Sequence, residues 1–324
     1  MAYQIDGTTI INDTGGIDSA QDKVIANQSL ELAGPVTSQA QGTVSGYASG
    51  GQPTSNIIEK FPFTSDANAT DVGDLTQTRT GSGGQSSTVS GYTSGGLINP
   101  PYTNVIDKFP FAADANATDV GDLTLERFNV AGQSSTVSGY SSGGRAIPPA
   151  APVQTNTIDK FPFSTDSNAT DVGDLVLGRY AAGQSSETSG YTTGGFPSTV
   201  SIDKFPFAAD GNATDVGDIT GGSYLVYHAG QNSVSHGYVS GGLPGTTSLS
   251  ISKFSFAADG NTSDVGDLTQ ARSSVAGQSS SESGYTSGGN SLNTIDKFPF
   301  ATDANATDVG DLTVARRVYA GQQV

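Results

Sequence analysis

Residues 91–123 read GYTSGGLINPPYTNVIDKFPFAADANATDVGDL, and near copies of this stretch follow one another along the chain. The Gly-Tyr pair that opens the stretch recurs at intervals of 45, 48, 51, 47 and 47 residues. A sequence that repeats at such a period builds its fold from one structural unit per repeat. The opening glycines of the six copies are Gly46, Gly91, Gly139, Gly190, Gly237 and Gly284.

Each copy holds short segments rich in Phe, Tyr, Val, Ser and Thr, bounded by Gly, Asn, Asp and Pro, which are strand and turn signals. In the third copy these segments predict strands over 130–135, 137–143, 156–161 and 171–175. None of them has the length or the 3.6-residue periodicity of a helix. Four short strands per repeat are typical of a propeller blade. The sequence therefore predicts an all-β fold, a six-bladed β-propeller over residues 42–324.

The two ends of the repeat array are incomplete, and they complement each other. The array begins at Thr43 with the second strand of a blade, and it ends over residues 318–324 with a first strand. We expect the C-terminal strand to complete the first blade and close the propeller. Closure would remove the exposed sheet edges that favour aggregation.

Composition excludes several classes of function. The chain of 324 residues has no Cys and two His, so it offers no disulfide, no thiolate metal site and no thiol nucleophile. Its net charge of −17 makes nucleic acid a poor partner. No apolar run reaches the length of a membrane span, and the first residues lack the pattern of a signal peptide. We expect a protein made in a cytoplasm, without membrane insertion.

An acidic motif, Asp-x-Asn-x-Thr/Ser, precedes the Asp-Val segment of each copy, as at Asp66, Asn68 and Thr70. Alternating oxygen ligands are found in calcium loops. The glycine at position six and the glutamate at position twelve of such a loop are missing here, however. We therefore predict that these side chains cap a turn and that the chain has no metal site. Calcium at these turns is the alternative.

An arginine follows the Asp-Val-Gly-Asp segment in five copies, and Ser223 stands at its place in the fourth. We expect each arginine to pair with a carboxylate such as Asp74 or Asp122 between blades. A ring of arginines around the axis that binds an anion is the alternative.

The copies differ most between the Gly-Gly pair and the Lys-Phe pair, as in LINPPYTNV at 97–105 and RAIPPAAPVQTNT at 145–157. Alternate strand connections emerge on one face of a blade, so these loops share a face. They are stiffened by proline, and we expect their apolar side chains to be exposed and to contact a partner protein or a glycan. Neutral drift of tolerant surface loops is the alternative. The candidate binding residues are Leu97, Ile98, Tyr102, Arg145, Ile147, Phe196 and Leu243.

The repeats resemble kelch repeats, the family that includes the galactose-oxidase propeller. The residues that carry the resemblance in the first copy are Gly50-Gly51, Lys60-Phe61 and Arg79, with Val72 where kelch repeats have Trp. The resemblance implies a propeller but little about activity, because one fold hosts many functions. The copper site of galactose oxidase requires a cysteine, and nearly every Asp here belongs to the repeat. We predict that the protein is not an enzyme and has no cofactor.

Residues 1–41 differ from the repeats and form an attachment segment and tether. The stretch AYQIDGTTII at 2–11 alternates weakly around a turn at Asp6-Gly7. It resembles the N-terminal segments of tailed-phage fibre and virion structural proteins, and the repeats are similar to propellers encoded by marine phages. The resemblance implies attachment to other virion subunits, for which the candidate residues are Tyr3, Ile5, Ile10 and Ile11.

Together these resemblances imply a non-enzymatic virion protein, a tail-fibre-like or head-fibre-like adhesin that presents its loops to a host-surface glycan or protein. We also expect a homo-oligomer. A purely architectural virion protein that binds only other particle subunits is the first alternative. A carbohydrate-active enzyme is the second.

Overall fold

A computed structural model describes residues 3–5, 8–11, 41–98, 101–146, 153–197, 199–220, 225–243, 249–317 and 319–324. Contacts divide the chain into two units, Met1–Val36 and Thr37–Val324. In the first unit β1 (Tyr3–Ile5) pairs antiparallel with β2 (Thr8–Ile11). No helix within the described ranges is long and apolar enough to span a membrane.

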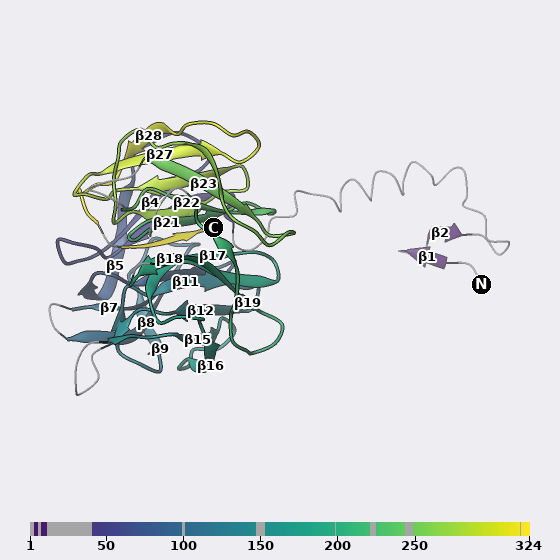
Figure 1. Ribbon diagram of the computed structural model, residues 1–324, viewed down its shortest axis with the longest axis horizontal. Coiled ribbons are helices and arrows are strands. Elements are labelled where there is room, and N and C mark those ends of the chain that lie inside the picture. The colour runs from purple at the N-terminus through teal and green to yellow at the C-terminus, as the bar shows by residue number, and fades with distance from the viewer. Residues whose placement is uncertain are drawn as a thin grey trace. The chain divides into compact units, whose positions relative to one another are not determined.

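The described part of the second unit is built from antiparallel four-stranded sheets, which we number 1 to 6 (Figure 1). Sheet 1 consists of β29 (Ala320–Gln323), β3 (Ser45–Ser49), β4 (Ser55–Pro62) and β5 (Thr70–Arg79). Sheet 2 consists of β6 (Gly83–Ser86), β7 (Ser90–Leu97), β8 (Tyr102–Pro110) and β9 (Thr118–Asp122). Sheet 3 consists of β11 (Ala131–Ser134), β12 (Ser138–Ser142), β15 (Thr157–Pro162) and β16 (Thr170–Asp174).

The later repeats form the same arrangement. Sheet 4 consists of β17 (Tyr180–Ser185), β18 (Ser189–Phe196), β19 (Thr199–Pro206) and β20 (Thr214–Asp218). Sheet 5 consists of β21 (Ala229–Asn232), β22 (His236–Ser240), β23 (Ser250–Ser255) and β24 (Ser263–Asp267). Sheet 6 consists of β25 (Ala276–Ser279), β26 (Ser283–Ser287), β27 (Thr294–Pro299) and β28 (Thr307–Asp311).

The strands expected for the third copy are thus found within one or two residues of their predicted ends, and the all-β class is confirmed. A small sheet of β10 (Arg127–Phe128), β13 (Arg145–Ala146) and β14 (Val153–Gln154) was not predicted. Strands β13 and β14 belong to the long connection of the third copy, and Phe128 lies opposite Arg145.

Sheet 1 joins the two ends of the array. Its strand β29 comes from the C-terminus and pairs with β3, from Ala320 opposite Ser49 to Gln323 opposite Gly46. The next strand, β4, pairs with β3 so that Gly46 lies opposite Phe61. A Cβ atom on Gly46 would lie 2.4 Å from the Phe61 ring, and the other five copies have the same glycine–phenylalanine contact. Glycine is needed there because the ring of its neighbour fills the space.

The core lies between sheets rather than within one sheet. Tyr47 of sheet 1 packs against Phe109 and Phe111 of sheet 2, with ring centroids 5.5 and 4.9 Å apart. On the other side of sheet 1, Phe61 packs against Tyr285 of sheet 6. Since both faces of a sheet are buried, one repeat cannot form a core alone.

The first strands of the sheets approach one another at a glycine. A Cβ atom on Gly132 would lie 2.1 Å from the carbonyl oxygen of Gly84, too close for any side chain. Similar distances, 2.1 to 2.3 Å, link the glycines in the order Gly84, Gly132, Gly183, Gly230, Gly277 and Gly321, and Gly84 has the same contact with Gly321. The glutamine after each glycine donates from Nε2 to a tyrosine carbonyl of the next sheet, as Gln85 does to Tyr140 at 2.9 Å.

Candidate functional site

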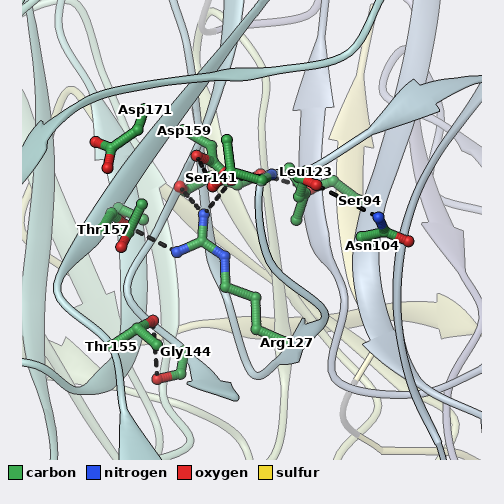
Figure 2. Close-up of polar contacts among 12 residues, drawn as sticks. Ser94, Asn104, Leu123, Arg127, Ser141, Gly144, Thr155, Thr157, Asp159 and Asp171 are labelled. Atoms are coloured by element: carbon green, nitrogen blue, oxygen red, sulfur yellow. Dashed lines mark hydrogen bonds and ion pairs between the residues drawn. The ribbon is translucent and has the colours of Figure 1, made fainter. Parts of the chain in front are cut away.

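The repeated arginines were the first candidate site, and they are buried between sheets. Arg127, which follows sheet 2, is fully buried, and its Nη2 lies 2.9 Å from Asp159 Oδ2 in sheet 3 (Figure 2). The same guanidinium donates to the carbonyls of Ser141 and Thr157, which belong to sheet 3 as well. Burial lowers the pKa of Arg127, and the neighbouring Asp159 opposes that shift.

The expected pairing between sheets is thus confirmed, but its carboxylate was predicted wrongly. The partner is the acid of the Ile-Asp-Lys-Phe motif in the following sheet, not Asp74 or Asp122. Thr124 also donates to Asp159, from its amide and its hydroxyl. The five pairs are Arg79–Asp107, Arg127–Asp159, Arg179–Asp203, Arg272–Asp296 and Arg316–Glu59. Arginines that have these partners and no exposed surface are not available to an anion in solution.

The interface between sheets 4 and 5 replaces the ion pair with other contacts. Leu225, not Ser223, takes the position of the arginine. The Leu225 carbonyl accepts a hydrogen bond from the amide of Gly195, just as the Arg179 carbonyl accepts one from the amide of Gly144. Ser223 lies outside the described residues. Ser252 stands where the other copies have the acid of the ion pair, and Leu225 packs in an apolar cluster with Val239.

A third change at this interface supplies the missing acceptor. Thr262 stands where the other copies have alanine, and its hydroxyl accepts from the amide of Thr220 at 2.9 Å. In the other copies a carboxylate accepts this bond, as Asp159 does from Thr124. Three residue changes therefore replace the buried ion pair with an apolar contact, while the Thr220 amide keeps an acceptor.

The acidic Asp-x-Asn motif also links sheets. Lys297 of sheet 6 contacts Asp66 of sheet 1 at 3.1 Å, and Asn68 Oδ1 accepts from the amide of Asp311 in sheet 6. The asparagine thus caps the neighbouring sheet, not its own turn as predicted. The other five copies have the same two contacts. These contacts give the motif a structural role, while calcium binding stays untested.

The variable connections lie on one face, which we call the loop face. It comprises the connections between second and third strands and those between fourth strands and the following first strands. The chain enters the second unit on the opposite face, where Gly42 donates to the carbonyl of Ser279 at the end of β25. We call that opposite side, with the turns between first and second strands, the turn face.

The predicted binding residues differ in exposure. Phe196 is 42% exposed, as expected. The other apolar candidates that the structure describes are less exposed than expected, because they pack against neighbouring elements, and Arg145, for which no exposure was predicted, is half-buried as well. The half-buried residues are Leu97, Ile98, Tyr102, Arg145 and Leu243. Ile147 lies outside the described residues, and Tyr3, Ile5, Ile10 and Ile11 lie in β1 and β2, where only the strand pairing is described.

The structure brings two of these residues into a row of aromatic rings on the loop face. Tyr102 contacts Phe128 with centroids 4.7 Å apart, and Phe128 lies 6.4 Å from Tyr180. Tyr180 in turn stacks on Phe196 at 5.2 Å and lies 5.9 Å from Tyr227. We call these five residues the aromatic row. It extends from sheet 2 to the connection that precedes sheet 5.

Three members of the row were not among the predicted site residues. Phe128, Tyr180 and Tyr227 lie in or beside the connections that follow the arginine, where the other copies have small or polar residues such as Thr80 and Ser273. The signal that could have predicted them is the difference between copies in the residues that follow the arginine. Tyr227 also has a positive φ of 57°, a conformation that is rare for a bulky residue but that Gly81, Asn129 and Ser274 share at the corresponding place in their copies.

Beside the aromatic row, the loop face is hollowed at the first strands. A cavity of about 130 Å³ is lined by Tyr180, Tyr227, Asn129 and Ser274, with the glycines of the first strands as its floor. A smaller hollow of about 50 Å³ lies on the other side of these glycines. Burial raises the pKa of Tyr180, the adjacent Tyr227 hydroxyl adds to this shift, and Arg145 acts against it.

Charge is distributed unevenly around the second unit. Apart from the five paired arginines, the connections of the loop face carry three charged residues, Glu126, Arg145 and Arg317. The fourth strands instead carry two aspartates in every copy, as at Asp71 and Asp74. In sheets 2 to 6 the second of these aspartates is the last residue of its strand, so it borders the loop face at the outer edge of the sheet.

His228 also lines the cavity. Its Nε2 lies 3.1 Å from the Thr193 hydroxyl, and its buried Nδ1 has no hydrogen-bond partner among the described residues. Burial, to which the positive charge of Arg179 adds, lowers the pKa of His228 to about 4. The imidazole is therefore neutral at physiological pH.

We predict that Arg127→Leu lowers the free energy of unfolding by about 3–5 kcal/mol, because it leaves Asp159 buried without its cation. The triple variant Arg127→Leu/Asp159→Ser/Ala169→Thr copies the interface of sheets 4 and 5 and should recover most of this loss. Urea unfolding measures both values. A triple variant as unstable as the single one would contradict this account of the interface.

We predict that stability falls with acid through His228. Its folded pKa of about 4 is lower than that of an unfolded histidine, 6.5, so protons bind preferentially to the unfolded chain between these values. The stabilisation is fully present above pH 6.5 and is lost as the pH falls towards 4, by about 3 kcal/mol.

Denaturant unfolding at pH 7 and pH 4 tests this effect on the parent and on His228→Gln, which should lack that part of the pH dependence. His236→Gln, which changes the half-buried histidine, is the matched control and should retain most of it. Equal pH dependence in the parent and His228→Gln would refute the assignment.

Comparison with known proteins gives no family for this chain. No protein-family model matches the sequence, and no curated protein matches it. The resemblance to kelch repeats and to virion proteins therefore stays a prediction.

Proposed function

We propose that residues 42–324 form a six-bladed kelch-like β-propeller closed by the C-terminal strand, and that the protein is a non-enzymatic phage virion adhesin. In this proposal, sheets 1 to 6 are the blades, residues 1–41 attach the chain to other virion subunits, and the loop face binds the host surface. The aromatic row is the observation that carries the binding role.

Contacts between the first and last repeats support closure. Strand β29 pairs with β3, and Arg316 of the last repeat pairs with Glu59 of sheet 1. Gly321 approaches Gly84 as the other first-strand glycines approach one another. The link between the ends thus uses the same interactions as the links between consecutive sheets.

Exposed aromatic rings on a nearly uncharged face support a binding surface. Phe196 and Tyr227 are 42% and 36% exposed, and Tyr and Phe are enriched where proteins contact partners. The aromatic row is supported from below by buried first strands, so its rings are held in position before binding, which reduces the entropy lost on association. The first described residues of the second unit lie on the turn face, where Gly42 donates to the carbonyl of Ser279, and not on the loop face.

A non-enzymatic role is supported by the contacts of the carboxylates. Asp107, Asp159, Asp203 and Asp296 are buried in ion pairs, and the loop aspartates contact lysines of neighbouring sheets. Glycoside cleavage requires a pair of carboxyl groups that flank the bond to be broken. Glu126 is the one acid in the connections of the loop face, so these connections do not offer such a pair.

One observation favours the architectural alternative. Val89 and Val137, each 66% exposed, and Val44, 54% exposed, lie on the turn face in three neighbouring sheets. Exposed apolar residues that recur in adjacent repeats suit contact with another particle subunit. The architectural function would use the turn face and make no use of the aromatic row.

We predict that the full-length protein binds saturably to cells of its host, tested with a panel of bacterial cells that includes marine isolates. The variant Phe196→Ser/Tyr227→Asn removes the exposed rings, and asparagine tolerates the positive φ at position 227. This variant should bind at least about tenfold more weakly, because central aromatic residues dominate binding energy. Fluorescence of labelled protein on washed cells measures the affinity.

The matched control is Val89→Ser/Val137→Ser, which changes two exposed side chains of the turn face and should bind cells like the parent. The proposal fails if no cells are bound while the protein still assembles on particles. Loss of particle assembly in the valine variant would then favour the architectural function.

A further inference from the structure

Arg145 and Arg317 differ from the other cations of the second unit because neither has an anion among the described residues. Five arginines are in buried ion pairs, the six lysines contact loop aspartates, and Arg317 donates to Gln52. No described carboxylate lies within ion-pair distance of Arg145. Its buried Nε lacks an acceptor among the described residues, as does the Nε of each of the five ion-paired arginines. The undescribed residues between 41 and 324 contain no Asp or Glu that could pair with it.

The position of Arg145 relates this cation to the aromatic row. Arg145 lies opposite Phe128 in the pairing of β10 with β13, and Phe128 contacts both Tyr102 and Tyr180. A half-buried guanidinium next to aromatic rings, without a counter-ion of its own, is suited to an anion that arrives with a ligand. Guanidinium binds carboxylate through two parallel hydrogen bonds, which also fixes the orientation of the ligand.

Local charge permits an anionic ligand although the whole chain is acidic. Apart from the ion-paired arginines, the connections of the loop face carry two cations, Arg145 and Arg317, against one acid, Glu126. Charges further apart than about 8 Å are largely screened at physiological ionic strength. The field at Arg145 is therefore set by its own neighbours rather than by the net charge of −17.

We propose that the loop face binds a carboxylate-bearing saccharide, with Arg145 holding the carboxylate and the aromatic row contacting the faces of the sugar rings. This inference rests on the proposed function of host-surface binding and names its ligand class. A sugar ring has apolar C–H faces and hydroxyl edges. The site offers matching groups: aromatic faces in the row, and the polar side chains of Asn129 and Ser274 at the cavity.

The dimensions of the site fit a chain of small units. The cavity of about 130 Å³ is smaller than the roughly 300–1,000 Å³ of pockets that enclose a drug-sized ligand. It is therefore too small to enclose more than one sugar unit, while the row, extending from Tyr102 to Tyr227, provides a shallow surface for the neighbouring units.

Calorimetry with the full-length protein tests this proposal. The probes are oligosaccharides of galacturonate, glucuronate and mannuronate, each compared with its carboxyl-reduced neutral counterpart. At least one acidic oligosaccharide should bind about tenfold or more tightly than its neutral counterpart, as expected for a charge-assisted bidentate contact. Arg145→Gln should abolish this difference and leave binding of the neutral counterpart unchanged.

Arg317→Gln is the matched control, because it removes the other unburied cation of the loop face and should keep the preference for acid. The proposal is overturned if no acidic oligosaccharide of the panel is preferred, or if both arginine variants lose the preference equally. It is also overturned if peptides and not saccharides compete for the site.

These outcomes separate the ligand class from the proposed function. If cell binding depends on Phe196 and Tyr227 but not on Arg145, adhesion stands and the acidic ligand is wrong. If cell binding is absent altogether, the adhesin function itself is wrong.

Discussion

A buried guanidinium that finds its partners in the neighbouring sheet is the interaction on which the repeat array depends. Arg127 leaves sheet 2 and bonds to a carboxylate and two carbonyls of sheet 3. Neither the arginine nor the acid is satisfied within its own repeat, and a buried charge without its partner is strongly destabilising. A repeat is therefore stable only when its neighbours are present. The same holds at the join of the ends, where Arg316 meets Glu59.

This arrangement separates the residues that hold the fold from those that are free to vary. The glycines, glutamines, arginines and motif acids form contacts between sheets, and they recur in nearly every copy. The connections of the loop face take part in few of these contacts, so their length and content differ between copies without loss of the core. The aromatic row lies in these connections and at their edges, where Tyr180 starts a first strand and Phe196 ends a second one. A regular scaffold thus carries an irregular surface.

The sequence predicted the parts of this structure that depend on local pattern. Strand positions, the shared face of the variable loops and the pairing of the C-terminal segment with β3 all follow from the repeat and from strand geometry. The partner of the arginine was not predictable in the same way. Asp74 and Asp122 are close to the arginines in sequence, whereas Asp107 and Asp159 are brought to them by the packing of one sheet on the next.

The role of Leu225 was missed because the fourth copy has an insertion. The segment from Ile219 to Gln231 is two residues longer than the corresponding segment from Leu123 to Gln133 in the second copy, which shifts the position that the arginine would occupy. The aromatic row was predicted only in part, since Phe128, Tyr180 and Tyr227 lie in or beside the connections between fourth and first strands, outside the variable loops between second and third strands.

We propose that the sheets form a closed cycle in which the last strand completes the first sheet. Removing residues 319–324 from the full-length chain tests it most directly, with thermal unfolding followed by circular dichroism. The matched control removes six residues, 147–152, from the long connection of the third repeat. The account predicts that the first deletion abolishes the cooperative transition or causes aggregation, because it exposes the edge of β3 and removes Gly321 from the glycine contacts. The control should melt close to the parent. A chain without residues 319–324 that melts like the parent would contradict the account.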